Sequence, residues 1–141
     1  MLKVTNLRKV YGSGEGATEA IADVSFEVAK GEFVCIVGPS GAGKTTLLKT
    51  VSGLMAPTAG DVELGGERVQ DPPERMALVF QDYSRSLYPW MKVSENVAFP
   101  LRRKKMSKAE RRATVEQAVE SVGLASSIGK YPWELSGGMQ Q

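Results

Sequence analysis

The sequence has no histidine, one cysteine and no hydrophobic run long enough to span a membrane. Without histidine, the chain has no imidazole for acid–base catalysis or metal binding. Its single cysteine, Cys35, cannot form an internal disulfide, and its apolar neighbours predict a buried packing residue. No segment reaches the roughly 18 apolar residues of a membrane helix, and the N-terminus lacks the apolar core of a signal peptide. We therefore expect a cytoplasmic chain that does not cross a membrane.

The sequence also lacks a large excess of charge of either sign. Its 141 residues include 18 Lys and Arg and 16 Asp and Glu, which gives a formal net charge of +2. A balance this close to zero predicts no general attraction to nucleic acid or to a membrane surface. The length is that of one ordinary globular domain.

A glycine-rich segment at residues 38–45 has the pattern Gly-x-x-x-x-Gly-Lys-Thr. It follows an apolar run at residues 33–37, predicted to be a strand, and precedes a helical run at residues 47–51. Glycines let successive backbone N–H groups turn toward a di- or triphosphate, and the helix N-terminus adds partial positive charge. In this pattern Lys44 reaches the β- and γ-phosphates, and the Thr45 hydroxyl is placed for Mg²⁺. The sequence therefore predicts a phosphate-binding loop formed by Gly38, Pro39, Ser40, Gly41, Ala42, Gly43, Lys44, Thr45 and Thr46.

Local patterns predict the elements around this loop. Alternation indicates strands at residues 2–10 and 21–28, a hairpin turning at Gly65 and Gly66, and an apolar strand at residues 76–80. The helix after Lys44 should end at Gly53.

Helical patterns dominate from residue 94 onward. Ser94 is expected to cap a short helix that stops near Pro100. Ser107 and Glu110 form a capping-box pattern before a second helix that ends at Gly123. Its expected buried positions repeat at helical spacing and are Val115, Ala118, Val119 and Val122.

A basic cluster overlaps the start of this second helix; it consists of Arg102, Arg103, Lys104, Lys105, Lys108, Arg111 and Arg112. Such a cluster has two interpretations, a nucleic-acid contact or a solvated helix face. Acidic residues interleave with it at Glu110, Glu116 and Glu120, which favours the solvated face. We therefore expect no nucleic-acid partner.

The chain ends in a second glycine motif, made of Leu135, Ser136, Gly137, Gly138, Met139, Gln140 and Gln141. Ser136 suits a helix N-cap, and the two glycines leave the first N–H groups unobstructed, as an anion site requires. Together with the upstream loop, this segment resembles the signature motif of the ABC-transporter ATPases. The resemblance covers residues 2–141.

This resemblance implies further roles. Gln81, at the end of the strand predicted at residues 76–80, resembles the glutamine that contacts Mg²⁺ and the attacking water in the family. Tyr11 resembles the aromatic residue that stacks on adenine. The segment after Gln81 resembles importer ATPases for nitrate, sulfonate and taurine, and its Tyr88 and Trp90 could either contact membrane subunits or pack within the helical subdomain.

Parts of the family pattern are missing from these 141 residues. In the family, an apolar strand ending in Asp-Glu and then a histidine follow the signature motif, and neither is present here. The expected fold is a truncated α/β P-loop NTPase with an N-terminal antiparallel β portion. Residues 1–85 would form the nucleotide-binding core and residues 86–141 a helical subdomain.

The resemblance implies the ATP-binding subunit of an importer, peripheral to the cytoplasmic face of the membrane. It would bind ATP and Mg²⁺, pair head to tail with a second copy, and drive solute uptake through separate membrane subunits. With the catalytic base region missing, the 141 residues themselves are expected to be inactive. The alternatives are an inactive nucleotide-binding fragment or an ABC-type ATPase acting on nucleic acid or ribosomes. A P-loop small-molecule kinase would leave the signature motif unexplained.

Overall fold

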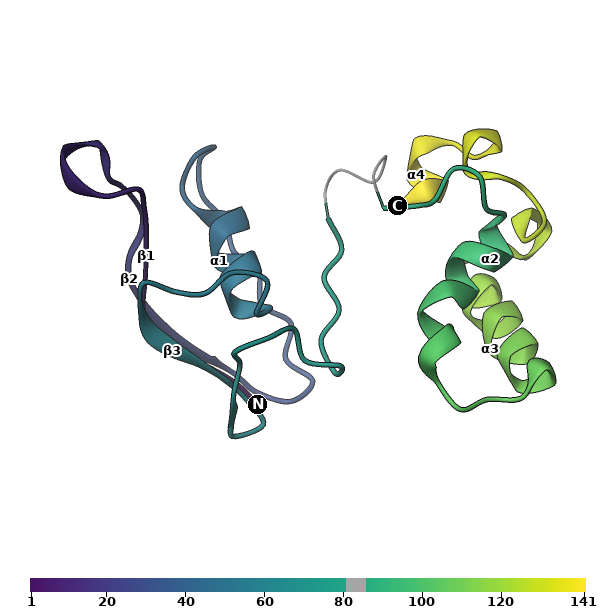
Figure 1. Ribbon diagram of the computed structural model, residues 1–141, viewed down its shortest axis with the longest axis horizontal. Coiled ribbons are helices and arrows are strands. Elements are labelled where there is room, and N and C mark those ends of the chain that lie inside the picture. Colours follow the sequence, from purple (N-terminus) through teal and green to yellow (C-terminus); the bar gives the residue numbers. More distant parts are fainter. Residues whose placement is uncertain (81–85) are drawn as a thin grey trace. The chain divides into compact units, whose positions relative to one another are not determined.

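The computed structural model describes residues 1–80 and 86–141. These residues form two compact units, Met1–Leu78 and Val79–Gln141 (Figure 1). The domain boundary predicted from the sequence, between residues 85 and 86, stays a prediction. We describe each unit by itself.

The first unit is built on an antiparallel sheet with the strand order β2-β1-β3-β4. Its strands are β1 (Leu2–Tyr11), β2 (Thr18–Val28), β3 (Ala59–Leu64) and β4 (Glu67–Arg68), and a short 3₁₀ turn η1 (Gly14–Gly16) joins β1 to β2. Val4 of β1 lies opposite both Phe26 and Val62. β1 is therefore a central strand, and the predicted antiparallel β portion is confirmed.

One helix, α1 (Lys44–Val51), packs on this sheet (Figure 1). Every third or fourth side chain of α1 turns toward the sheet, as the 3.6-residue helical repeat requires. The buried core consists of Val4, Leu7, Ile21, Leu47, Val51 and Val62. Gly53 follows the helix with a φ of 74°, which is the left-handed end that the sequence predicted.

The hairpin between β3 and β4 turns at Gly65 and Gly66. Their φ angles are 65° and 87°, and two successive positive φ angles are what the tightest hairpin turns require. This prediction is confirmed.

Two predicted strands are absent from the described residues. Residues 33–37 and 76–80 have no regular secondary structure. Both runs have the apolar side chains of buried strands, but neither has a neighbouring strand to complete its backbone hydrogen bonds, and a strand needs such a ladder. In consequence Phe33 is 93% exposed. Cys35 is exposed as well, so the prediction of a buried thiol is wrong.

The second unit is helical. It contains α2 (Val93–Ala98), η3 (Phe99–Arg103), α3 (Lys108–Ser121), η4 (Ala125–Ser127), η5 (Pro132–Glu134) and α4 (Gly137–Gln140). Figure 1 shows α2 lying along α3. The buried core of this unit is Val93, Val115, Val119 and Leu135.

The ends of α3 follow the sequence, whereas two details elsewhere do not. Ser107 caps α3, because its Oγ accepts from the Glu110 N–H while the Glu110 carboxylate accepts from the Ser107 N–H. Ser94 does not cap α2; the N-cap is Lys92, whose N–H is bound by the Glu95 carboxylate at 2.7 Å. Because Glu95 binds the Lys92 N–H, the helix begins at Val93, one residue before Ser94.

The predicted apolar stripe of α3 is narrower than expected. Val115 and Val119 are buried, whereas Ala118 is exposed and Val122 is 69% exposed. The segments that pack against α3 in this unit bury only Val115 and Val119 of the four predicted positions. Within the described residues, no helix is long and apolar enough to cross a bilayer.

Candidate functional site

The glycine-rich loop leads directly into α1. Gly43 is the helix N-cap and has the left-handed φ of 80°, and Gly41 has a φ of 83°. No side chain caps this helix end, and its first turn carries no acidic residue. The first backbone N–H groups of α1 thus keep the partial positive charge that suits an anion.

Gly43 is required by a close approach of two backbones. A Cβ built on Gly43 would lie 2.2 Å from the carbonyl oxygen of Ala20 in β2. Gly41 has no atom within 4 Å of the equivalent position, so this part of the loop is open. Gly43 therefore allows the loop to contact the β2 backbone, while Gly41 leaves the loop backbone accessible to a ligand.

Lys44 folds back over the loop it follows. Its Nζ donates to the carbonyl oxygens of Gly38 at 2.7 Å and Pro39 at 2.6 Å. Across the described parts of the chain, no carboxylate forms an ion pair with it. A cation held by two neutral carbonyls keeps its charge available for an anion at the loop.

The first turn of α1 also carries two hydroxyl groups. Thr45 is exposed, and Thr46 is half-buried. The Thr46 Oγ1 lies 3.2 Å from the Tyr11 hydroxyl at the end of β1. The structure thus brings together Tyr11 and Thr46, which the sequence singled out separately.

Two neighbours of Tyr11 were not identified from the sequence. Its hydroxyl donates to the Met55 sulfur at 3.1 Å, and the Lys9 Nζ lies 5.6 Å from the centre of its ring. Lys9 precedes Tyr11 by two residues and so lies on the same face of β1, which is a signal that could have found it. Met55 follows α1 in a loop, and no pattern in the sequence points to it.

The remaining predicted site residues belong to the second unit or to the undescribed segment. Gln81 lies outside the described residues. Ser136 is the N-cap of α4, but its side chain makes no capping hydrogen bond there; its carbonyl oxygen accepts from the Met139 N–H at 3.0 Å. The Gln140 side chain donates to the carbonyls of Pro132 and Leu135 at 2.9 and 3.1 Å, and these contacts tie the motif to the turn before it.

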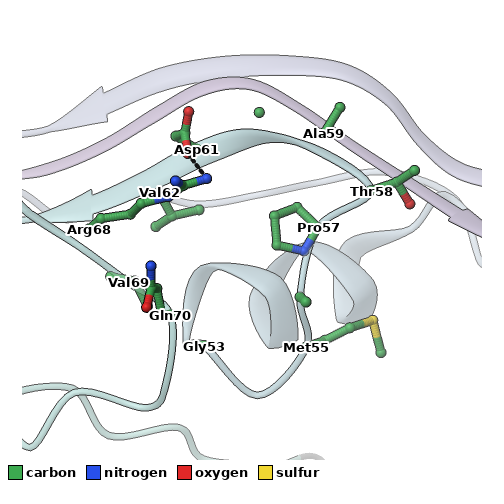
Figure 2. A pocket seen from close by; sticks show the side chains of 12 residues that line it. Gly53, Met55, Pro57, Thr58, Ala59, Asp61, Val62, Arg68, Val69 and Gln70 are labelled. Atoms are coloured by element: carbon green, nitrogen blue, oxygen red, sulfur yellow. Dashed lines mark ion pairs between the residues drawn. The ribbon is translucent and has the colours of Figure 1, made fainter.

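The first unit contains a hollow, whose lining side chains are drawn in Figure 2. It measures about 430 Å³ and is lined by Gly53, Met55, Ala56, Pro57, Thr58, Ala59, Gly60, Asp61, Val62, Arg68, Val69 and Gln70. Two of these lining residues, Arg68 and Asp61, form an ion pair. None of the predicted site residues lines it, so the hollow is not the predicted phosphate site.

Comparison with known proteins identifies the family to which the chain belongs. The profile of the ABC transporter family matches residues 21–141. The chain belongs to the ABC transporter family. The α/β P-loop fold and the resemblance predicted from the sequence are thereby confirmed.

Individual ABC transporter proteins give the same result. The chain is 42% identical over 140 residues to the nitrate import ATP-binding protein NrtD of Synechocystis sp., matching 99% of this chain and 52% of that protein. It is 44% identical over 128 residues to the taurine import ATP-binding protein TauB of Sinorhizobium fredii, matching 90% and 47%. The chain thus spans about half the length of the curated relatives it matches.

A solved ABC cassette has the same fold. The ATP-binding cassette MJ0796, in a dimeric post-hydrolysis state bound to ADP and phosphate, matches 99% of this chain and 65% of its own with a TM-score of 0.86 and 33% identity.

Proposed function

We propose that the chain is part of the ATP-binding subunit of an ABC importer, in which ATP binding and hydrolysis drive solute uptake. The observation that carries this proposal is the Lys44 ammonium group, which donates to two carbonyl oxygens of the glycine-rich loop and has no carboxylate partner among residues 1–80 and 86–141. The names of the relatives, which include import ATP-binding proteins for nitrate and taurine, support the transport role.

The loop fits the phosphates of a nucleotide on three counts. Gly41 is open to a ligand, the first turn of α1 has no acidic residue, and the Lys44 charge is not neutralised. Backbone N–H groups and an ammonium group together stabilise phosphate charge, and such charge-assisted contacts are about twice as strong as neutral hydrogen bonds. Residues 38–46 would therefore hold the phosphates.

A magnesium ion would be held by the Thr45 hydroxyl and Gln81. Thr45 is exposed on the first turn of α1, next to Lys44, so its hydroxyl is accessible to an ion. The ion would neutralise charge between the β- and γ-phosphates. Among the described residues no three Asp, Glu or Cys side chains cluster as a metal site of their own, so the phosphates would supply the other ligands.

The nucleotide base would stack on Tyr11. The Tyr11 ring is 40% exposed, and its hydroxyl contact to Thr46 keeps it at the end of the loop that would carry the phosphates. Stacking on a π-face favours a nucleotide with little selection of the base.

Two partners complete the proposal. A second copy would cover the nucleotide with its residues 135–141, head to tail, and the dimeric state of MJ0796 supports a paired cassette. Membrane subunits would contact an aromatic cluster in which the ring centre of Tyr88 lies 5.5 Å from that of Trp90 and 4.8 Å from that of Phe99. Trp90 is 70% exposed. The subunit would then sit at the cytoplasmic face of the membrane.

The test is an ATP titration of the Lys44→Ala variant. Removing one charge-assisted contact of about 1.5–3 kcal/mol should weaken ATP binding tenfold or more. Lys49→Ala is the matched control, because Lys49 lies on the same helix, beyond the turn that meets the loop, and should bind ATP as the wild type does. Equal affinities of the Lys44→Ala variant and the wild type in isothermal titration calorimetry would contradict the proposal.

A further inference from the structure

A basic pocket lies between α2 and α3 in the second unit. It has a volume of about 530 Å³ and is lined by Lys92, Ser94, Glu95, Ala98, Lys108, Arg111, Arg112, Val115, Glu116, Ile128 and Gly129. The backbone bond from the Ser94 N–H to the Ile128 carbonyl, at 3.0 Å, holds the loop at residues 128–129 against the start of α2. The walls of the pocket are thus two helices and a loop fastened to one of them.

The two carboxylates in this pocket already have partners. Glu95 accepts from the Lys92 backbone N–H at 2.7 Å, and Glu116 accepts from the Arg112 Nε at 2.7 Å. Four cationic side chains line the pocket against these two carboxylates. The lining therefore has a net positive charge of two.

Among the cationic side chains that line this pocket, Arg111 has a buried hydrogen-bond donor that lacks an acceptor within the described residues. Its Nε is buried and has no hydrogen-bond partner in the part of the chain that the structure describes. A buried donor on a charged group is costly when it lacks an acceptor. The solvated face expected for the basic cluster therefore holds for most of its members but not for Arg111, which is half-buried.

Apolar side chains also line this pocket. Val115 is 5% exposed, and Ala98 and Ile128 are half-buried. A pocket lined by both apolar and cationic side chains matches a ligand that has an apolar body and one anionic group. Its volume of about 530 Å³ is within the range of sites for small molecules.

We propose that this pocket binds a small amphipathic anion, a phosphate or carboxylate group on an apolar body, through Arg111. The anionic group would accept from the Arg111 guanidinium, and the apolar body would lie on Val115 and Ile128. The site is independent of the glycine-rich loop and of ATP. It would give the helical unit a ligand of its own.

Phenyl phosphate is the probe, and ¹⁵N-resolved NMR titration of the 141-residue chain is the measurement. We expect saturable shifts of the Ser94, Ile128 and Gly129 amide signals. Inorganic phosphate should cause them only at higher concentration, and benzyl alcohol, which lacks the charge, should not cause them. Lys44→Ala should leave this titration unchanged, which separates the pocket from the phosphate-binding loop.

Variants of Arg111 test whether its guanidinium group binds the anionic group of the probe. Arg111→Gln should raise the dissociation constant about tenfold or more, because a charge-assisted contact is lost, and Arg111→Lys, which keeps the charge, should lose less. The matched control is Arg103→Gln, because Arg103 is an exposed arginine outside this pocket; it should stay within about twofold of the wild type. Should Arg111→Gln disturb the folded spectrum, the Arg111→Lys titration and the benzyl alcohol comparison still test the site.

Three results would overturn the proposal. Shifts confined to residues 38–46 would assign the probe to the loop of the first unit. Equal weakening by Arg111→Gln and Arg103→Gln would show general charge attraction without a site. Binding of benzyl alcohol as tight as that of phenyl phosphate would show that the pocket does not recognise an anion.

Discussion

The Tyr11 hydroxyl lies 3.2 Å from the Oγ1 of Thr46. This contact joins the end of the central strand β1 to the first turn of α1, whose N-terminus faces the glycine-rich loop. Residues 35 positions apart in the sequence are thereby held beside one another. Because Tyr11 is held at the loop by this contact, its variants test the proposed nucleotide site.

Tyr11→Ala should lose roughly 1–3 kcal/mol of ATP affinity if the ring stacks on the base. Tyr11→Phe keeps the ring and removes only the hydroxyl contacts to Thr46 and Met55, so it should lose little. Calorimetric titration with ATP and Mg²⁺ compares the three chains. An alanine variant that binds as tightly as the wild type would make Tyr11 a structural residue of β1.

Gly43→Ala should destabilise the first unit more than Gly41→Ala does. Both glycines have positive φ, so each substitution carries a backbone strain of about 1–2 kcal/mol. Only at Gly43 would the new Cβ also meet backbone, the Ala20 carbonyl oxygen at 2.2 Å. We expect Gly43→Ala to be worse by at least about 1 kcal/mol in the free energy of unfolding, measured with urea. Equal losses would mean that the loop moves away from β2 without cost.

Ser107→Ala should destabilise the second unit by about 0.5–2 kcal/mol, because the N-cap of α3 is lost. Ser121→Ala is the matched control: this serine lies at the other end of the same helix, and its Oγ donates to the Ala118 carbonyl at 2.7 Å. Urea unfolding followed by the circular dichroism of the helices gives both values. A loss at Ser121 equal to that at Ser107 would contradict the capping role.

The same cap predicts a pH dependence. Hydrogen bonding by Ser107, first through its side chain and second through its backbone N–H, lowers the pKa of Glu110 from its ordinary value of 4.5. The folded unit therefore favours the charged carboxylate, so this contribution to stability is complete above pH 4.5 and is lost as the pH falls through the lowered pKa. Ser107→Ala should flatten that part of the stability profile, and an unchanged profile would show that other groups set it.

The 141 residues should release no phosphate from ATP above background, even with Mg²⁺ and at concentrations that favour pairing. The sequence has no histidine and no Asp-Glu pair after an apolar strand, and a positioned general base contributes about 10²–10⁴ in rate. Lys44→Ala controls for contaminating ATPases. Steady turnover that disappears in this variant would contradict the prediction.

Features set by near neighbours in the sequence were predictable. Gly65 and Gly66 turn the hairpin, and Ser107 with Glu110 caps α3, because in each case the residues that satisfy one another are adjacent or three apart. The backbone conformation of the glycine-rich loop at residues 38–46 belongs to the same class, whereas its binding of phosphate stays a prediction. Its conformation depends on Gly43 and on the helix that begins at Lys44.

Features that depend on distant partners were not predictable. The apolar run at residues 33–37 has the composition of a strand, but composition cannot say whether another strand lies beside it. Cys35 was predicted to be buried for the same reason and is exposed. The Tyr11 contact to Met55 and the unpaired Nε of Arg111 arise from packing between segments, and neither leaves a pattern in the sequence.

The central place of β1 also sets the order in which the first unit can assemble on the ribosome. β1 and β2 are neighbours in the chain, so their pairing needs only a short loop to close. β3 lies on the other side of β1 and follows the glycine-rich loop and α1 in the chain. The unit can therefore complete its sheet only after the loop and α1 have been synthesised, and until then the edge of β1 that β3 will occupy is a place where another chain could bind.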